Sequence, residues 1–177
     1  MTTSLNSIPL ISRVNIKMSP VGPEADAASA QFAKVFSTVW ARLPSPAKVS
    51  LTIAWRATPA TIFLTKRWTG QVGRLAQCAG QGTILHFYSP ALARMPDDVL
   101  AVCIAHELAR AFLFTTGDPH HCGGLDDRLF DKTLQYRLAE ALARGLCDAW
   151  GFNPRLLGRW CVENEAWFEA NASGFST

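Results

Sequence analysis

The sequence predicts an α+β fold in which a small mixed sheet packs on a buried helix, followed by two further helices. Three observations predict it: short runs of β-type residues lie between residues 49 and 88, residues 99–114 are apolar nearly all round, and long runs with helical spacing follow residue 126. With 177 residues, 49% of them hydrophobic and 18% charged, the chain suits one globular domain. We expect residues 1–24 to form a loosely ordered lead-in and residues 25–177 to form the domain.

The elements of the first half follow from the spacing of apolar residues. Residues 26–43 have one apolar face at helical spacing, and residues 49–55 alternate with period two, which predicts a strand. Residues 61–64 predict a second strand, and residues 69–82, with four glycines, a loop or an irregular hairpin. Residues 83–88 predict a further strand. The apolar face of the first helix consists of Phe32, Val35, Phe36, Val39 and Trp40.

The second half of the chain predicts helices. Pro96, Asp97 and Asp98 suit the first turn of the apolar helix, and Gly117 suits its end. Residues 126–150 predict a long helix that Gly151 terminates, and a last helix is expected from residue 154 to about residue 170. The apolar stripe of the long helix consists of Phe130, Leu134, Leu138, Leu142 and Leu146.

Residues 106–110 read His-Glu-Leu-Ala-Arg, one residue away from the HExxH motif of zinc hydrolases. In that motif two histidines four residues apart bind zinc from one helix face, and the glutamate activates a metal-bound water. His106 and Glu107 are present, whereas Arg110 stands where the second histidine belongs. Buried charges cost several kcal/mol each unless they are paired or metal-bound, so these groups on an apolar helix indicate a lined site. The alternative is an internal ion pair of Glu107 and Arg110 beside a core histidine.

The surroundings of this motif carry a family resemblance. The stretch from Ile84 to Phe152, with Phe-Tyr-Ser-Pro at 87–90, Pro-Asp-Asp at 96–98 and Ile-Ala-His-Glu-Leu-Ala at 104–109, resembles compact zincin metallopeptidases of the gluzincin type, including the SprT-like and ImmA/IrrE-like groups. The resemblance implies a minimal zincin-like fold with zinc as the cofactor of an active member. It also implies that His106 and Glu140 are metal ligands and that Glu107 is the catalytic general base.

Glu140 has two interpretations. As a third ligand it would lie on a face with Ala143 and Cys147, away from the leucine stripe, and that face is expected to pack on the motif helix. As a surface residue it would pair with Arg137 and Arg144, an exposed arrangement worth only a few tenths of a kcal/mol.

Arg110 decides which activity is expected. A guanidinium stays charged and offers no lone pair to a metal. At an effective dielectric near 20, zinc ~4 Å from it would experience ~8 kcal/mol of repulsion, against ~10–16 kcal/mol for a structural site with four ligands. We therefore expect a metal-free, inactive zincin-like protein that serves as a binding or structural module. In it Arg110 pairs with Glu107, Glu140 or both.

Two alternatives remain open. The first is an active zinc-dependent peptidase with His106, Glu140 and a substitute ligand, and with Glu107 as general base. The substitute would come from His120, His121 or Cys122, although a flexible polar loop explains these residues better than a ligand role does. The second alternative is a coincidental motif in an unrelated α+β domain.

Charge and cysteine content narrow the class of protein. A net charge of +3 with scattered arginines does not indicate a nucleic-acid partner, and no run reaches the ~18 apolar residues of a membrane span. Five cysteines without a Cys-x-x-Cys pair indicate reduced thiols rather than a disulfide framework. We expect a cytoplasmic protein whose partner is a peptide or a protein; the sequence leaves its oligomeric state open.

Overall fold

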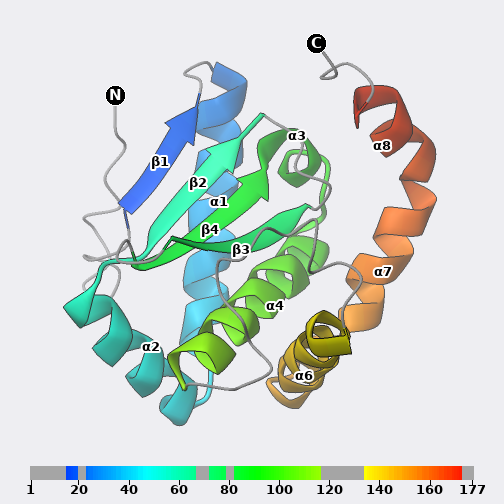
Figure 1. The fold of residues 1–177 in the computed structure, drawn as a ribbon. Helices are drawn as coiled ribbons and strands as arrows, with labels where there is room; N and C mark the ends of the chain where they lie inside the picture. Colours follow the sequence, from blue (N-terminus) through cyan, green and yellow to red (C-terminus); the bar gives the residue numbers. More distant parts are fainter. Residues whose placement is uncertain (1–14, 20–22, 67–71, 79–81, 117–133, 173–177) are drawn as a thin grey trace.

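A four-stranded mixed sheet forms one layer of the protein. The computed structural model describes residues 15–19, 23–66, 72–78, 82–116 and 134–172. The strands are β1 (Asn15–Ser19), β2 (Thr61–Thr65), β3 (Gly73–Cys78) and β4 (Gly82–Tyr88), in the order β1-β2-β4-β3. β1, β2 and β4 are parallel, and β3 is antiparallel to β4 (Figure 1). The predicted α+β fold with a small mixed sheet is confirmed, as is the hairpin within residues 69–82.

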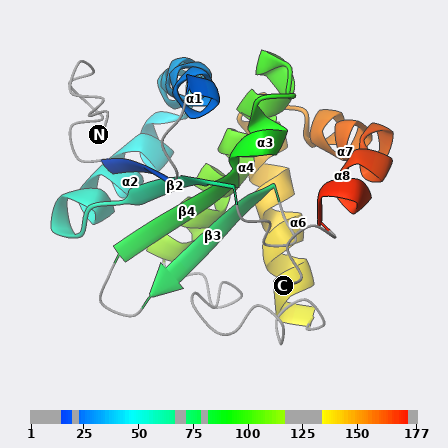
Figure 2. The same cartoon turned by 90° about the horizontal axis from the view of Figure 1, so that it is seen from above.

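Helices pack on one face of this sheet. Phe32 of α1 lies 4.9 Å from Phe87 of β4, measured between ring centroids, and both rings are buried. Phe63 and His86 point to the opposite face, where they stack at 5.1 Å and remain partly exposed. Figure 2 shows α1 and α3 on the same side of the strands. The described helices are α1 (Pro23–Arg42), α2 (Ser45–Ala57), α3 (Ser89–Leu92), α4 (Asp97–Thr115), α6 (Leu134–Ala149), α7 (Pro154–Glu163) and α8 (Glu165–Ala172).

The motif helix α4 lies at the centre of the molecule. Every residue from Val99 to Leu113 is buried except His106 and Phe112, because α1, α2, α6, α7 and β3 all pack against this helix. It begins after Pro96, as predicted, whereas Gly117 lies outside the described residues. A helix that is apolar all round is therefore surrounded by protein, as its composition predicts.

The strand predicted over residues 49–55 is wrong, because these residues lie in α2. Helix α2 buries Ala47, Leu51 and Trp55, which are four residues apart, and leaves Val49 and Ile53 56% and 63% exposed. The alternating pattern predicts Val49 and Ile53 as core residues, although both are exposed. A helix buries only one stripe of such a run, and tertiary packing overrides the β propensity of the others.

The leucine stripe predicted as the apolar face of α6 packs in the core only in part: Leu146 contacts the cluster of Ala109, Leu113 and Ala143. Leu138 and Leu142 are 38% and 41% exposed, whereas Ala139, Ala143 and Cys147 are buried. Small side chains allow α6 to approach the alanine-rich surface of α4 closely, which the longer leucines would prevent. The predicted start of this helix and Phe130 lie outside the described residues.

Both ends of the chain differ from the prediction in detail. Part of the expected lead-in forms β1, which pairs with β2, and α1 already begins at Pro23. The predicted last helix is interrupted at Asn164, whose side-chain amide donates a 2.9 Å hydrogen bond to the carbonyl oxygen of Trp160. Gly151 terminates α6 as predicted, with a φ of 82° that favours glycine. No helix among the described ranges is long and apolar enough to cross a membrane.

Candidate functional site

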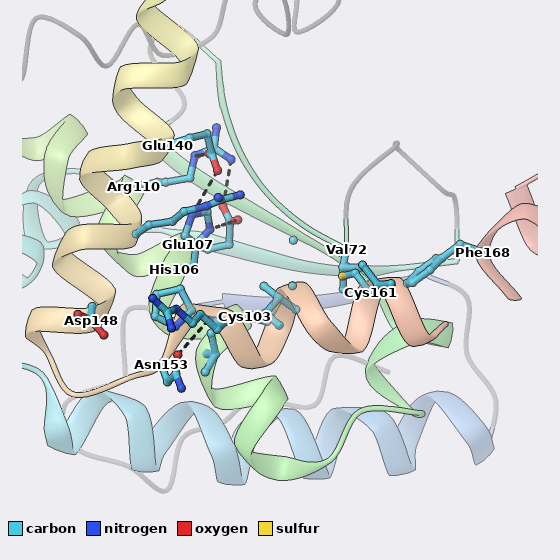
Figure 3. A pocket seen from close by; sticks show the side chains of 18 of the residues that line it. Val72, Cys103, His106, Glu107, Arg110, Glu140, Asp148, Asn153, Cys161 and Phe168 are labelled. Carbon is cyan, nitrogen blue, oxygen red and sulfur yellow. Dashed lines mark hydrogen bonds and ion pairs between the residues drawn. The ribbon is translucent and has the colours of Figure 1, made fainter. Parts of the chain in front are cut away.

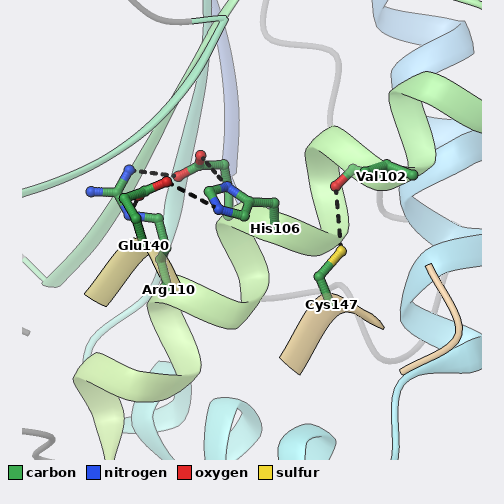
Figure 4. A network of polar contacts seen from close by, with 6 residues as sticks. Val102, His106, Arg110, Glu140 and Cys147 are labelled. Carbon is green, nitrogen blue, oxygen red and sulfur yellow. Dashed lines mark hydrogen bonds and ion pairs between the residues drawn. The ribbon is translucent and has the colours of Figure 1, made fainter. Parts of the chain in front are cut away.

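Four charged side chains from α4 and α6 form a closed ring (Figures 3 and 4). The His106 ring lies between two carboxylates, with Nδ1 3.3 Å from Glu107 Oε1 and Nε2 3.3 Å from Glu140 Oε2. Arg110 closes the ring, with Nη1 3.5 Å from Glu107 Oε2 and Nε 3.4 Å from Glu140 Oε1. Each carboxylate therefore contacts both cationic side chains, and the charges alternate around the ring.

Local helix geometry explains this arrangement. His106 and Arg110 are four residues apart and Glu107 precedes Arg110 by three, so all three project toward one side of α4. Glu140 comes from α6, next to the Ala139 and Ala143 face that packs on α4. The predicted ion pair of Glu107 and Arg110 is thus present, and the structure brings all four predicted site residues together. The interpretation of Glu140 as a surface residue is wrong.

The ring is buried. The exposed fractions of the side chains are 13% for His106, 3% for Glu107, 9% for Arg110 and 18% for Glu140. When His106 is protonated, the two cationic and two anionic side chains leave the ring with no net charge. Removing one partner from such a group leaves an uncompensated buried charge, which is far more costly than losing a surface pair.

The titration of the ring follows from these contacts. Burial alone would lower the pKa of His106, but the Glu107 and Glu140 carboxylates outweigh burial and raise it from 6.5 to about 9. Burial alone would raise the pKa of Glu140, but His106, Arg110 and Arg144 hold it below its usual value. His106 is therefore a cation and Glu140 an anion at neutral pH, so the ring carries its full set of charges.

Some carboxylate oxygens of the ring still have hydrogen-bonding capacity. The contacts of 3.3–3.5 Å are longer than the ~2.7–2.9 Å of strong charge-assisted hydrogen bonds. Glu107 Oε2 and Glu140 Oε1 are buried and accept no hydrogen bond from any described residue. The ring is therefore held mainly by charge, and both glutamates line a pocket that a hydrogen-bond donor could enter.

This pocket has a volume of about 1260 Å³ and lies between the start of β3 and helices α4, α6, α7 and α8. In Figure 3 the ring lies on one side of the pocket and Val72, Cys161 and Phe168 lie on the other. Arg155, Glu165 and Glu169 also line the pocket from α7 and α8, so this wall mixes apolar and charged side chains. Gly145 and Gly158 also line it, and a Cβ added at either would meet no atom within 4 Å. The space is large enough for several amino-acid side chains.

A close approach of β3 to the motif helix shapes the wall near Glu107. A Cβ at Gly73 would lie 3.0 Å from Glu107 Cγ, 3.2 Å from Cys103 Sγ and 3.2 Å from Phe87 Cε1. Only glycine lets the strand run this near to α4. Gly73 lies in the stretch predicted as a loop or an irregular hairpin, and its role at this contact is not among the predictions, although a lone glycine inside a strand is a signal of close approach.

The residues present do not complete the zinc site that the resemblance implies. The 3.3 Å separation of His106 Nε2 and Glu140 Oε2 matches the ~3.4 Å between two ligands of a tetrahedral zinc. The next ligand position is occupied by Arg110, which cannot bind a metal. Within the described ranges no three His, Cys, Asp or Glu side chains are arranged to hold a metal ion. The substitutes His120, His121 and Cys122 lie outside those ranges.

Comparisons with protein-family models, with curated protein sequences and with solved structures found no match.

Proposed function

We propose that this protein is a metal-free, catalytically inactive relative of the zincin metallopeptidases that acts as a binding module. The observation that carries the proposal is the closed ring, in which Arg110 contacts both Glu107 and Glu140 from the position of the missing histidine. A guanidinium there supplies the positive charge that a metal would otherwise supply between the two helices. The active-peptidase alternative is supported by the ligand-like spacing of His106 and Glu140.

The same contacts argue against peptidase chemistry. A general base must take a proton from a water molecule that a nearby metal has made acidic. Here both Glu107 oxygens contact other side chains, Oε1 the His106 ring and Oε2 the Arg110 guanidinium.

The pocket supports a peptide or a protein segment as the ligand. Its mixture of apolar and charged side chains suits a peptide with both kinds of side chain. Val72 of its rim precedes β3 and Gly73 begins it, and β3 lies at the edge of the described sheet. Outer strands have backbone groups that can pair with an extended peptide. We place this binding in the cytoplasm, because Cys103, Cys147 and Cys161 are free thiols.

Metal content tests the loss of the zinc site. Wild-type protein purified without a histidine tag should hold well under one equivalent of zinc by mass spectrometry, and Arg110→His should hold close to one. Arg144→His is the matched control, since Arg144 lines the same pocket but lies outside the ring, and it should resemble the wild type. His106→Gln added to Arg110→His should abolish zinc binding.

The other outcomes decide between the alternatives. Zinc in the wild type, with hydrolysis of casein that a chelator stops, would establish an active peptidase with a substitute ligand. Zinc in neither protein would contradict the zincin-like interpretation of Glu140.

Peptide binding is tested separately with a pool of random extended peptides on the immobilised full-length protein. Wild-type protein should retain a subset, and Gly158→Trp, which places a large ring in the pocket where a Cβ meets nothing, should retain none of it. Val49→Trp on the distant helix α2 is the control for added surface hydrophobicity. Equal retention by all three proteins would contradict binding in this pocket.

A further inference from the structure

Glu140 is the carboxylate of the ring that is more open to the pocket. Its side chain is 18% exposed, compared with 3% for Glu107. Among the described residues, Glu140 Oε1 accepts no hydrogen bond, and Oε2 lies 3.3 Å from His106 Nε2. An ionised carboxylate can accept about four hydrogen bonds. Glu140 therefore has acceptor capacity that the ring does not use.

The other carboxylate compensates both cations of the ring. Glu107 Oε1 lies 3.3 Å from His106 Nδ1, and Oε2 lies 3.5 Å from Arg110 Nη1. The four side chains together carry no net charge when His106 is protonated, so the ring neither attracts nor repels a distant ion strongly. A ligand group close to the ring interacts mainly with the atoms nearest to it, and the more exposed acceptor there is Glu140.

The charged residues that line the pocket outside the ring favour a cation. Asp148, Glu165 and Glu169 are acidic, whereas Arg144 and Arg155 are basic, and all five are exposed. The acids exceed the bases by one, which gives the entrance a negative charge. Such a charge attracts positively charged ligand groups and repels negatively charged ones.

A primary ammonium group on an apolar stem fits these features. It has three donors and no acceptor, and it is more compact than the planar guanidinium of arginine, which has five donors to satisfy. Val72, Cys161 and Phe168 lie across the pocket from the ring and offer apolar surface to an alkyl stem (Figure 3). Lysine side chains commonly pack their stems on such a surface while the charged end contacts a polar group.

We propose that the pocket binds the primary ammonium group of a peptide, from a lysine side chain or a free amino terminus, with Glu140 as its acceptor. The inference rests on the proposed function, because it names the chemical group through which the peptide is recognised. Glu140, which the family resemblance implies as a zinc ligand, is then a recognition residue of the metal-free protein.

Hexylamine and 1-hexanol are the probes for this site, because they have the same alkyl stem and differ in the charged donor. Each is titrated into isotope-labelled full-length protein, and binding is followed by the NMR shifts of the backbone amides. Hexylamine should bind the wild type at least about tenfold more tightly than 1-hexanol. Gly158→Trp, which places a large ring in the pocket, should abolish hexylamine binding.

Glu140→Gln should weaken hexylamine binding at least about tenfold, because it removes the charge of the acceptor. Glu163→Gln is the matched control, since Glu163 is an exposed glutamate of α7 that does not line the pocket, and it should bind hexylamine as the wild type does. The comparison of the two probes uses the wild type alone, so it tests the inference even if Glu140→Gln fails to fold.

Two peptides identify the source of the ammonium group. One has an acetylated amino terminus and a single lysine, and the other has a free amino terminus and no lysine. Each is compared with its fully acetylated counterpart, and the peptide that loses affinity on acetylation carries the recognised group. No loss for either peptide would overturn the inference.

Equal affinities for hexylamine and 1-hexanol would also overturn it, as would hexylamine binding that Gly158→Trp or a folded Glu140→Gln variant leaves intact. Retention of peptides that Gly158→Trp abolishes, together with equal affinities for the two probes, would remove ammonium recognition and leave the proposed function standing. Hexylamine binding without retention of any peptide would instead contradict a peptide as the ligand.

Discussion

The central prediction concerns the removal of the Arg110 charge. In Arg110→Met the ring keeps two carboxylates but only one cation, and Glu107 is almost fully buried. At an effective dielectric near 20, each contact of Arg110 at 3.4 or 3.5 Å corresponds to about 5 kcal/mol of attraction. Desolvation of the guanidinium and its repulsion from His106 offset much of this. The net loss of unfolding free energy should be about 3–5 kcal/mol, as for other buried pairs that lose one partner.

Urea unfolding followed by tryptophan fluorescence at pH 7 measures this loss. Arg144→Met is the control, since Arg144 is exposed and acts on Glu140 from outside the ring, and it should cost less than about 1 kcal/mol. Combining Arg110→Met with Glu140→Gln leaves one cation and one carboxylate, so the ring is again neutral. The double variant should lose less unfolding free energy than the sum of the two single losses. Equal losses for Arg110→Met and Arg144→Met would refute the idea that the ring is a buried electrostatic unit.

The pH dependence of this loss has a definite sign. With one cation for two carboxylates, one carboxyl group of the folded variant should gain a proton at a higher pH than it does in the unfolded chain. The variant therefore gains stability relative to the wild type as pH falls from 7 to 5. In the wild type the lowered pKa of Glu140 gives stability that is present above its unfolded pKa and is lost only at still lower pH. The difference between the two proteins should shrink over this window.

Three further predictions concern single residues. The pKa of His106 is raised to about 9, so the stability that its charge gives is complete below pH 6.5 and is lost as pH rises toward 9. The loss should be on the order of 3 kcal/mol of unfolding free energy. The unfolding free energy of His106→Gln should lack this dependence on pH. Gly73→Ala should lower the free energy of unfolding by about 1–3 kcal/mol, because its Cβ would lie 3.0 Å from Glu107 Cγ. Gly158→Ala, at an open position within a helix, should raise it by up to ~1 kcal/mol. Changes of the same sign in both variants would contradict the packing argument. Asn153→Ala removes the side-chain oxygen that accepts a hydrogen bond from the backbone N–H of Arg155 at the start of α7. The free energy of unfolding, measured by thermal denaturation, should fall by about 1 kcal/mol. No change would mean that the cap is dispensable.

The sequence predicts the site better than it predicts the secondary structure around it. Charges on an apolar helix require partners, so the convergence of His106, Glu107 and Arg110 with a carboxylate from a neighbouring helix follows from burial alone. Glu140 is singled out as that carboxylate by the family resemblance, and the small side chains beside it agree with packing on α4.

The errors have a common physical origin. In α2, Val49 and Ile53 are apolar but exposed, and in α6, Leu138 and Leu142 are apolar but lie outside the core. Hydropathy patterns assume that large apolar side chains are the ones that pack inside. In α6, small side chains make the contact with α4, and the two leucines remain exposed. The pocket walls from α7 and α8 depend on tertiary packing and have no local signal.

Metal binding should be coupled to folding in the variant Arg110→His. Arg110→His removes a permanent cation, so without zinc this variant keeps two carboxylates for the single cation His106 and should lose about as much stability as Arg110→Met. Zinc supplies the missing positive charge, and at a thousand times its dissociation constant it would add about 4 kcal/mol. The melting temperature of Arg110→His should therefore be low with a chelator and should rise steeply with zinc, while that of the wild type should not change with either. A variant that is as stable as the wild type without zinc would mean that Arg110 does not take the place of a metal. The contacts of 3.4 and 3.5 Å would then be incidental to the stability of the fold.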